Sequence, residues 1–377
     1  MDLSTLPIID AHAHPLVVEG GAPDTADLIR PLTEARREAQ AEAASCVSVG
    51  AAIRELAGFF GVSSDVGAVV TAARAAREGD EGRADLTRRI LAQARIEALV
   101  IDDGYPPANA LPLDLPAMGE ECGDVAIHRA LRIERVAERL IAKEKTFDGF
   151  RHALQKELTG LRDRGIVSLK SIIGYRGGLE VEPRADIDAA KTAFEDRPKR
   201  LDGLAARPLL DWLFHEALAA CAREDVPLQI HAGFGDRDID LRTADPSALK
   251  PLLDTGAAAD ARIVILHAAY PHVAQAAWLA TVFEEVWVDF SLVTLQLGPI
   301  LENVLQTLLA GAPARKVVYG SDASLLPEAF WVAAAQTRRA LGHVLDGWID
   351  RGVLDREAAR ALAEDLLAGN ARRLYGI

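Results

Sequence analysis

Two histidines separated by a single residue, His12 and His14, are the part of this sequence best suited to chemistry. They follow the apolar pair Ile8 and Ile9, which favours a buried strand. Residues two apart on a strand point to the same side, so both imidazoles can face one point. Imidazole is the commonest side-chain ligand for metal ions in proteins. Taken alone, the pair is explained equally well as two histidines beside a turn, so the rest of the sequence has to decide.

The elements that must position these histidines are eight short apolar runs rich in β-branched residues. They predict strands at 8–11, 96–101, 130–133, 167–173, 228–231, 263–267, 286–290 and 317–320. Stretches with helical periodicity lie between most of them, at 24–45, 147–164, 209–224, 273–284 and 300–309, with Pro208 placed at the start of its helix. Strands that alternate with helices indicate a parallel sheet, and eight of them predict an α/β fold, the (β/α)8 TIM barrel.

Three stretches are longer than a minimal barrel needs. Residues 23–95, after the first strand, are rich in Ala and Arg and predict a helical insertion that caps the barrel mouth. Residues 106–123 contain repeated prolines and predict an ordered loop in place of a helix. Residues 179–204 form a third, charged insert that we expect to be exposed. Because no repeat or low-complexity linker interrupts the chain, we expect one domain over residues 1–377.

Charge and composition exclude several classes of function. The chain has 42 basic and 56 acidic residues and a net charge of −14, which repels phosphate backbones and argues against nucleic-acid binding. It has no apolar run of about 18 residues, so no membrane span is expected. The first residues lack the features of a secretory signal, and three scattered cysteines suit reduced thiols. We therefore expect a cytoplasmic protein with a small-molecule substrate, and the sequence is compatible with a homo-oligomer.

Polar residues stand at the ends of several predicted strands. In a barrel, the carboxyl ends of the strands meet at one mouth, where active sites are found. A lone histidine there is usually a packed core residue, and a lone lysine or aspartate is usually solvated. Their joint occurrence favours a metal site. The residues concerned are His12 and His14 directly after the first strand, Lys170 on the fourth, His231 on the fifth, His267 on the sixth and Asp322 directly after the eighth.

Several longer motifs resemble a known family. The sequence is similar to the amidohydrolase superfamily, and more closely to the amidohydrolase-related branch found as the N-terminal domain of nodulin-type and FluG-type glutamine synthetase-like proteins. The resemblance spans nearly the whole chain, although the stretch around 41–82 has no confident match. The motifs that carry it are IDAHAH at 9–14, IDDG at 101–104, LKSIIGYRGGL at 169–179, PLQIHAGFGD at 227–236, HAAYPH at 267–272 and NARRLY at 370–375.

The resemblance implies a metal centre with assigned roles. One divalent ion, for which zinc is preferred over Mn, Fe or Ni, would be held by His12, His14, His231 and Asp322. Such an ion lowers the pKa of a water molecule toward 7. Asp322 would act as the base, and His267 would polarise the substrate carbonyl.

Lys170 has three alternative roles. In binuclear members of the superfamily, a lysine on the fourth strand is carbamylated and bridges two metals. The nearby Tyr175 and Arg176 favour a second role, in which Lys170 and Arg176 bind a substrate carboxylate beside a single ion. A salt bridge below the site is the third alternative. Tyr175 and Tyr270 follow strand-end motifs and are expected to contact the substrate.

Two aspartates close to the first two strands also have alternative roles. Asp10 lies two residues before His12 and can support this histidine from behind or make a hydrogen bond from strand to loop. Asp102 ends the second strand and can fix the turn at Gly104 instead of entering the site.

The leading hypothesis for function is a metal-dependent hydrolase that cleaves a C–N bond, of the amide or amidine type, in a small carboxylated molecule. A metal-dependent decarboxylase or lyase of a small carboxylic acid is the alternative, because the fold does not fix the reaction. A non-catalytic barrel is the third reading. It predicts that some of the four metal ligands are lost, whereas all four are present.

Overall fold

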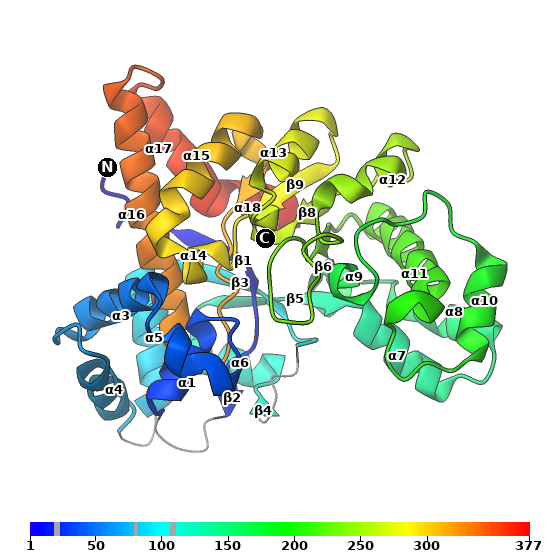
Figure 1. Cartoon of the computed structure of the whole chain (residues 1–377), viewed down its shortest axis with the longest axis horizontal. Helices are drawn as coiled ribbons and strands as arrows, with labels where there is room; N and C mark the ends of the chain where they lie inside the picture. Colours follow the sequence, from blue (N-terminus) through cyan, green and yellow to red (C-terminus); the bar gives the residue numbers. More distant parts are fainter. Residues whose placement is uncertain (19–22, 79–81, 106–110) are drawn as a thin grey trace. The chain divides into compact units, whose positions relative to one another are not determined.

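The eight main strands follow one another along the chain in the order β1-β3-β5-β6-β7-β8-β9-β10, which is that of a (β/α)8 barrel (Figure 1). The computed structural model describes residues 1–18, 23–78, 82–105 and 111–377. The predicted fold class is confirmed. The described residues form two compact units, the first made of Met1–His128, Phe290–Ala310 and Val317–Arg373, and the second of Arg129–Asp289, Gly311–Lys316 and Leu374–Ile377. A single domain over the whole chain stays a prediction.

The strands of the first unit begin with β1 (Ile8–Ala13), in which all six residues are buried. It pairs in parallel with β3 (Ile96–Asp102), and the register shifts between Asp10 and Ala13. Near-continuous apolar runs of this kind are typical of parallel strands covered on both faces. The same unit contains β10 (Val317–Val318) and a small antiparallel ribbon of β2 (Val17–Val18) and β4 (Leu111–Pro112).

The helices of the first unit confirm the predicted helical insertion. In α3, the buried residues Val49, Ala52, Ile53 and Leu56 recur at helical spacing, and this helix and α5 both pack on α16. A role for the insertion as a cap over the barrel mouth stays a prediction. The helices are α1 (Thr25–Ile29), α2 (Gln40–Ala43), α3 (Val47–Phe60), α4 (Val66–Ala75), α5 (Gly82–Ala94), α6 (Leu115–Cys122), α14 (Val293–Gln296), α15 (Leu301–Gly311), α16 (Glu328–Asp350), α17 (Arg356–Glu364) and α18 (Asn370–Tyr375).

The second unit contains five parallel strands that pair in sequence order. All five end one or two residues earlier than predicted. At β7 and β8 this difference places His231 and His267 in the connections that follow the strands rather than on them. The strands are β5 (Ala126–Arg132), β6 (Ile166–Ser171), β7 (Leu228–Ile230), β8 (Ile263–Ile265) and β9 (Val286–Asp289).

An aromatic cluster joins three helices of the second unit. Phe150 stacks on Phe194 with ring centroids 5.2 Å apart, and both rings lie close to Phe147. Phe194 belongs to the insert predicted to be exposed, so that prediction is wrong for the buried face of its helix. The helices of this unit are α7 (Ile133–Lys143), α8 (Phe147–Glu157), α9 (Ile173–Arg176), α10 (Ile187–Glu195), α11 (Gly203–Glu224), α12 (Lys250–Asp254) and α13 (Val273–Val282).

Two predictions based on proline are wrong. Residues 115–122 form helix α6 rather than a loop, because Asp114 caps the helix and Pro116 stands in its first turn, where a missing N–H costs nothing. Residues 106–110 of the same predicted loop lie outside the described residues. Helix α11 begins at Gly203, so Pro208 lies inside it and not at its start. The carbonyl that Pro208 leaves without its helical partner belongs to Leu204, which is 93% exposed and open to water.

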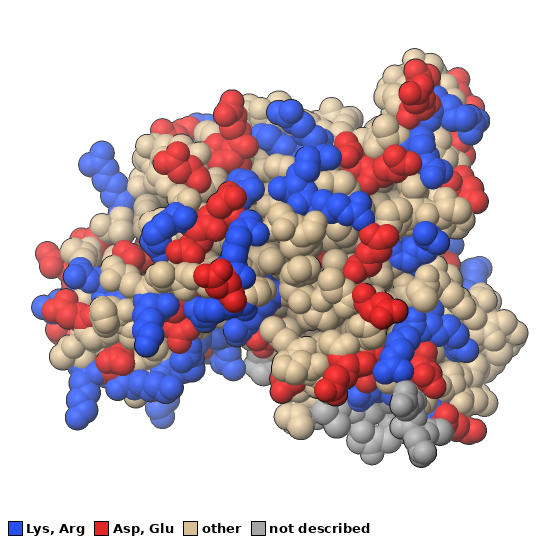
Figure 2. Space-filling view, turned by 180° about the vertical axis from the view of Figure 1, so that it is seen from behind, with Lys and Arg blue, Asp and Glu red and all other residues tan. Residues whose placement is uncertain are grey.

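None of the described helices combines the length and the apolar character that crossing a membrane requires. On the face that Figure 2 shows, basic and acidic side chains lie interspersed. This is unlike the continuous basic surface that nucleic-acid binding uses.

Candidate metal centre

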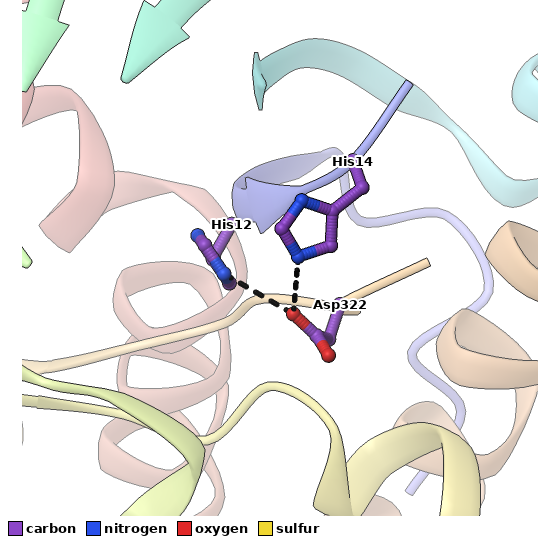
Figure 3. Close-up of side chains that lie close together, drawn as sticks. All are labelled: His12, His14 and Asp322. Atoms are coloured by element: carbon purple, nitrogen blue, oxygen red, sulfur yellow. Dashed lines mark ion pairs between the residues drawn. The ribbon is translucent and has the colours of Figure 1, made fainter. Parts of the chain in front are cut away.

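The first unit brings His12, His14 and Asp322 together (Figure 3). His12 is on β1, His14 follows its last residue, and Asp322 follows β10. One atom, Asp322 Oδ1, lies 3.1 Å from His12 Nε2 and 3.3 Å from His14 Nε2. The expectation that the spacing of the two histidines lets both imidazoles face one point is therefore met.

The protonation of His14 follows from its second contact. His14 Nδ1 lies 3.0 Å from the carbonyl oxygen of Asp102, and a carbonyl can only accept a hydrogen bond. Nδ1 therefore carries a proton, and in the neutral ring Nε2 presents a lone pair to the Asp322 carboxylate. Two such acceptors repel each other unless a cation lies between them. Donation of the remote N–H to a backbone carbonyl is also the usual arrangement of histidines that bind metals.

The three donors fit a divalent ion. Metal–ligand bonds of about 2.0–2.2 Å imply ligand atoms roughly 3.3–3.6 Å apart at tetrahedral angles. The distances from Asp322 Oδ1 to the two imidazole nitrogens, 3.1 and 3.3 Å, are close to the lower end of this range. His12 is fully buried and His14 is 8% exposed, so the donors are largely withdrawn from water. Two imidazoles and a carboxylate are a donor set that suits Zn, Mn, Fe or Ni.

The loop that carries Asp322 is tied to β1 by backbone hydrogen bonds. The N–H groups of Ala11 and His14 donate to the carbonyls of Tyr319 and Ala323, and the N–H of Asp322 donates to the carbonyl of His12. Asp322 has φ of +58°, a left-handed conformation that aspartate tolerates better than most residues. This conformation and these bonds together place its carboxylate between the two imidazoles.

Asp102 and Tyr105 also lie next to His14. Asp102 Oδ1 accepts the N–H of Gly104 at 3.0 Å, which confirms the predicted turn, and its carbonyl fixes His14. The role of that carbonyl escaped the sequence analysis because a backbone group has no signature in the residue type. The Tyr105 ring lies 4.8 Å from the His14 ring and is 38% exposed, so it can contact a molecule bound near the histidines.

The second unit holds another group of polar side chains after β7, β8 and β9. His267 Nε2 lies 3.0 Å from His231 Nδ1, and His231 Nε2 lies 3.1 Å from the carbonyl of Phe234. Both ring nitrogens of His231 thus face partners within this unit, and its role as a metal ligand stays a prediction. Asp289, at the end of β9, accepts the N–H of His267 at 3.2 Å. The sequence analysis missed Asp289, although a lone aspartate ending an apolar strand was a usable signal.

The predicted tyrosines belong to the same unit. The Tyr175 ring lies 4.4 Å from the His231 ring, and its hydroxyl accepts the N–H of Asp236. The centroid of the Tyr270 ring lies 5.5 Å from that of the Phe234 ring. Their roles in substrate binding stay predictions, as does the role of His267 toward a carbonyl.

The two predicted cations of the second unit are both buried. Lys170 is on β6, is 2% exposed and pairs in register with Gln229. Arg176 ends α9 and makes ion pairs with Glu138 at 3.3 Å and with Asp202 at 3.9 Å. Burial lowers the pKa of Arg176, although the guanidinium stays protonated at any working pH.

Glu134 is a buried carboxylate next to the strand that carries Lys170. Its Oε1 accepts a hydrogen bond from the Ser171 hydroxyl at 2.6 Å and one from the N–H of Ile172 at 2.9 Å. Burial raises the pKa of Glu134, and this effect outweighs the hydrogen bond from Ser171. Glu134 therefore ties the start of α7 to the end of β6 and helps to fix the backbone beside Lys170.

Known proteins resemble this chain over nearly all of its length. The sequence profile of the amidohydrolase family matches residues 9–377. The protein fluG of Emericella nidulans is 29% identical over 99% of this chain, and the chain spans 46% of the length of that relative.

Solved structures show the same fold. A protein from Lactobacillus casei, described as a candidate metal-dependent hydrolase, is 26% identical, with a TM-score of 0.87 over 100% of this chain and 97% of its own. The glucuronate isomerase of Caulobacter crescentus is 16% identical, with a TM-score of 0.72 over 99% of this chain and 92% of its own, and it shares the fold alone. Because the family profile covers almost every residue from the first strand to the last helix, the chain belongs to the amidohydrolase family and is an enzyme of that superfamily.

Proposed function

We propose that this enzyme hydrolyses a C–N bond, of the amide or amidine type, in a small molecule that carries a carboxylate. The observation that carries the proposal is the meeting of His12, His14 and Asp322 at one carboxylate oxygen. Membership of the amidohydrolase family supports the reaction class. The likeness to the Lactobacillus casei protein supports metal dependence.

His12, His14 and Asp322 would hold one divalent ion, for which we favour zinc, with His231 as a predicted fourth ligand. When bound, such an ion supplies Lewis acidity, which eases the deprotonation of water near neutral pH. The hydrogen bond from His14 Nδ1 to Asp102 keeps the ring in the tautomer that leaves Nε2 available. A second ion bridged by a carbamylated Lys170 is the less favoured arrangement.

Asp322 has the properties of a general base. Its Oδ1 faces the two imidazoles, whereas Oδ2 is turned away from them (Figure 3). A carboxylate oxygen in that position can take a proton from water and later deliver it to the leaving nitrogen. The Asp322 side chain is 15% exposed, so a small molecule can approach it.

The other proposed roles concern the substrate. His267 would donate a hydrogen bond to the carbonyl oxygen as negative charge develops there. Lys170 and Arg176 would bind the carboxylate, the arginine through two parallel N–H groups. Tyr175 and Tyr270 would contact the rest of the molecule.

A substrate screen tests the reaction class. The metal-loaded enzyme is incubated with a panel of N-acyl amino acids, carboxylated amides and amidines, and with simple carboxylic acids, while amine or ammonia and CO2 are both measured. Release of amine or ammonia from a carboxylated compound is the expected result. Release of CO2 without amine would replace this proposal by a decarboxylase, and preference for compounds without an acidic group would remove the carboxylate from it.

The variant Arg176→Met tests the carboxylate contact. A charge-assisted hydrogen bond contributes about 1.5–3 kcal/mol, so KM for the carboxylated substrate should rise roughly ten- to hundred-fold. The kcat should change far less if the contact is equal in the ground and transition states. Steady-state kinetics with the acid and with its neutral methyl ester provide the measurement.

The ion pairs of Arg176 with Glu138 and Asp202 require a matched control. Asp202→Asn removes the more distant ion pair, at 3.9 Å, and leaves the guanidinium in place, so it should leave KM unchanged. If Arg176→Met lowers thermal stability but KM for the acid stays at the wild-type value, Arg176 has a structural role only.

A further inference from the structure

Asp10 joins the two chain segments that carry the candidate metal ligands. It lies on β1, two residues before His12, and is fully buried. Its Oδ1 accepts the N–H of Ser321 at 2.8 Å, and Ser321 directly precedes Asp322. The same oxygen accepts the N–H of His12 at 3.3 Å. One carboxylate oxygen thus holds the backbone at a histidine ligand and next to the aspartate ligand.

The pairing of β1 is irregular beside Asp10. The register of β1 against β3 shifts between Asp10 and Ala13, so the regular ladder is interrupted just where His12 lies. Such irregularities re-aim side chains and leave backbone groups unpaired. The buried N–H of Ser321 donates to the Asp10 side chain rather than to a backbone carbonyl. A buried N–H without an acceptor is costly, so the Asp10 carboxylate stabilises the geometry that presents both ligands.

The neighbouring bonds make Asp322 sensitive to a movement of Ser321. Asp322 adopts its left-handed conformation directly after Ser321, and the Ser321 hydroxyl accepts the N–H of Ala323. Ser321 and Ala323 are therefore fixed on both sides of Asp322. Release of Ser321 from Asp10 would free the chain to leave the strained conformation of Asp322 and to move its carboxylate away from the imidazoles.

We propose that Asp10 is a positioning residue whose Oδ1 holds His12 and the Asp322 loop in the arrangement that binds the metal. The inference rests on the proposed metal centre and goes beyond it, because a residue that is not itself a ligand then contributes to the metal affinity of the site. The Asp10 carboxylate acts by accepting two N–H groups. An amide at this position should therefore preserve most of the metal affinity, whereas a side chain without an acceptor should not.

The test is the dissociation constant of Zn²⁺ and Co²⁺ for the full chain, measured by calorimetry and by competition with a chelator of known affinity. Loss of a group that supports a metal ligand typically weakens metal binding about 10- to 100-fold, which is the result expected for Asp10→Ala. Asp10→Asn should stay within about three-fold of the wild type, because its amide oxygen can accept both N–H groups.

Two further variants sharpen the test. Glu121→Gln changes a buried carboxylate of the same unit that contacts Arg83 and Thr87, and it should leave the metal affinity unchanged whatever it does to stability. Asp10→Glu keeps the charge and moves the acceptor oxygen, so this variant should bind metal more weakly than the wild type. It takes the place of Asp10→Ala in the test if the alanine variant does not fold.

The outcomes separate the inference from the proposed metal centre. Wild-type affinity in Asp10→Ala or Asp10→Glu would overturn the positioning role, and so would equally weak binding in Asp10→Ala and Asp10→Asn, because charge rather than hydrogen bonding would then be decisive. A wild-type chain that binds neither ion would overturn the metal centre, and the inference with it.

Discussion

Replacement of Asp322 by asparagine should lower kcat roughly 10³-fold, the range of a general base, while the protein still folds. The amide keeps the size of the carboxylate and can adopt the left-handed conformation found at this position. It cannot take a proton from water at neutral pH. Steady-state kinetics, thermal unfolding and circular dichroism of the variant provide the measurement.

Asp355→Asn is the matched control for this substitution. Asp355 caps α17 through the N–H of Ala358, and asparagine caps a helix about as well as aspartate. This control removes the same charge elsewhere in the first unit and should keep full activity. Near wild-type kcat in Asp322→Asn would show that another group is the base.

Removal of divalent metal should abolish activity and lower the thermal midpoint of the wild-type enzyme by several degrees. Binding of an ion to the folded state alone stabilises it by about 4 kcal/mol when the free ion is at a thousand times its Kd. Without the ion, no metal–ligand bonds hold His14 Nε2 and Asp322 Oδ1, which lie 3.3 Å apart, in this arrangement. The thermal midpoint and the activity are measured before chelation, after chelation, and after Zn²⁺, Mn²⁺ or Co²⁺ is added back.

The controls for chelation are variants that lack a ligand. His12→Ala should show the low thermal midpoint already, and a chelator should not lower it further. Full activity in a thoroughly chelated wild-type enzyme would contradict metal dependence. Equal sensitivity of His12→Ala and the wild type to chelation would place the ion elsewhere.

The alternation of apolar strands and amphipathic helices was enough to predict the barrel, because both periodicities are local. The strand ends were less predictable. The runs at 228–231 and 263–267 continue with alanine and other small or apolar residues, so nothing in them indicates that pairing stops at Ile230 and Ile265. Prolines misled the prediction at α6 and α11, because their effect depends on the helical position, which the sequence does not give.

The candidate metal ligands of the first unit were predictable because residue type carries the signal. Two histidines two residues apart and one aspartate after an apolar strand are scarce chemical groups in the expected places. Their support was only partly predictable. The Asp102 carbonyl that fixes His14 is a backbone group, and one of the two N–H groups that Asp10 Oδ1 accepts belongs to Ser321, which is distant along the chain. For Arg176, the sequence could not reveal that Glu138 and Asp202 lie beside it, because these residues are distant along the chain.

The central claim is that His12, His14 and Asp322 bind a divalent metal ion, and the metal content of the purified chain tests it most directly. Elemental mass spectrometry is applied to the wild type, to the double variant His12→Ala/His14→Ala and to His215→Ala. His215 contacts the carbonyl of Glu182 in the second unit, so its loss should not affect the metal centre. We predict about one tightly held ion per chain in the wild type and in His215→Ala, and almost none in the double variant. Equal metal content in the double variant and the wild type would contradict the account.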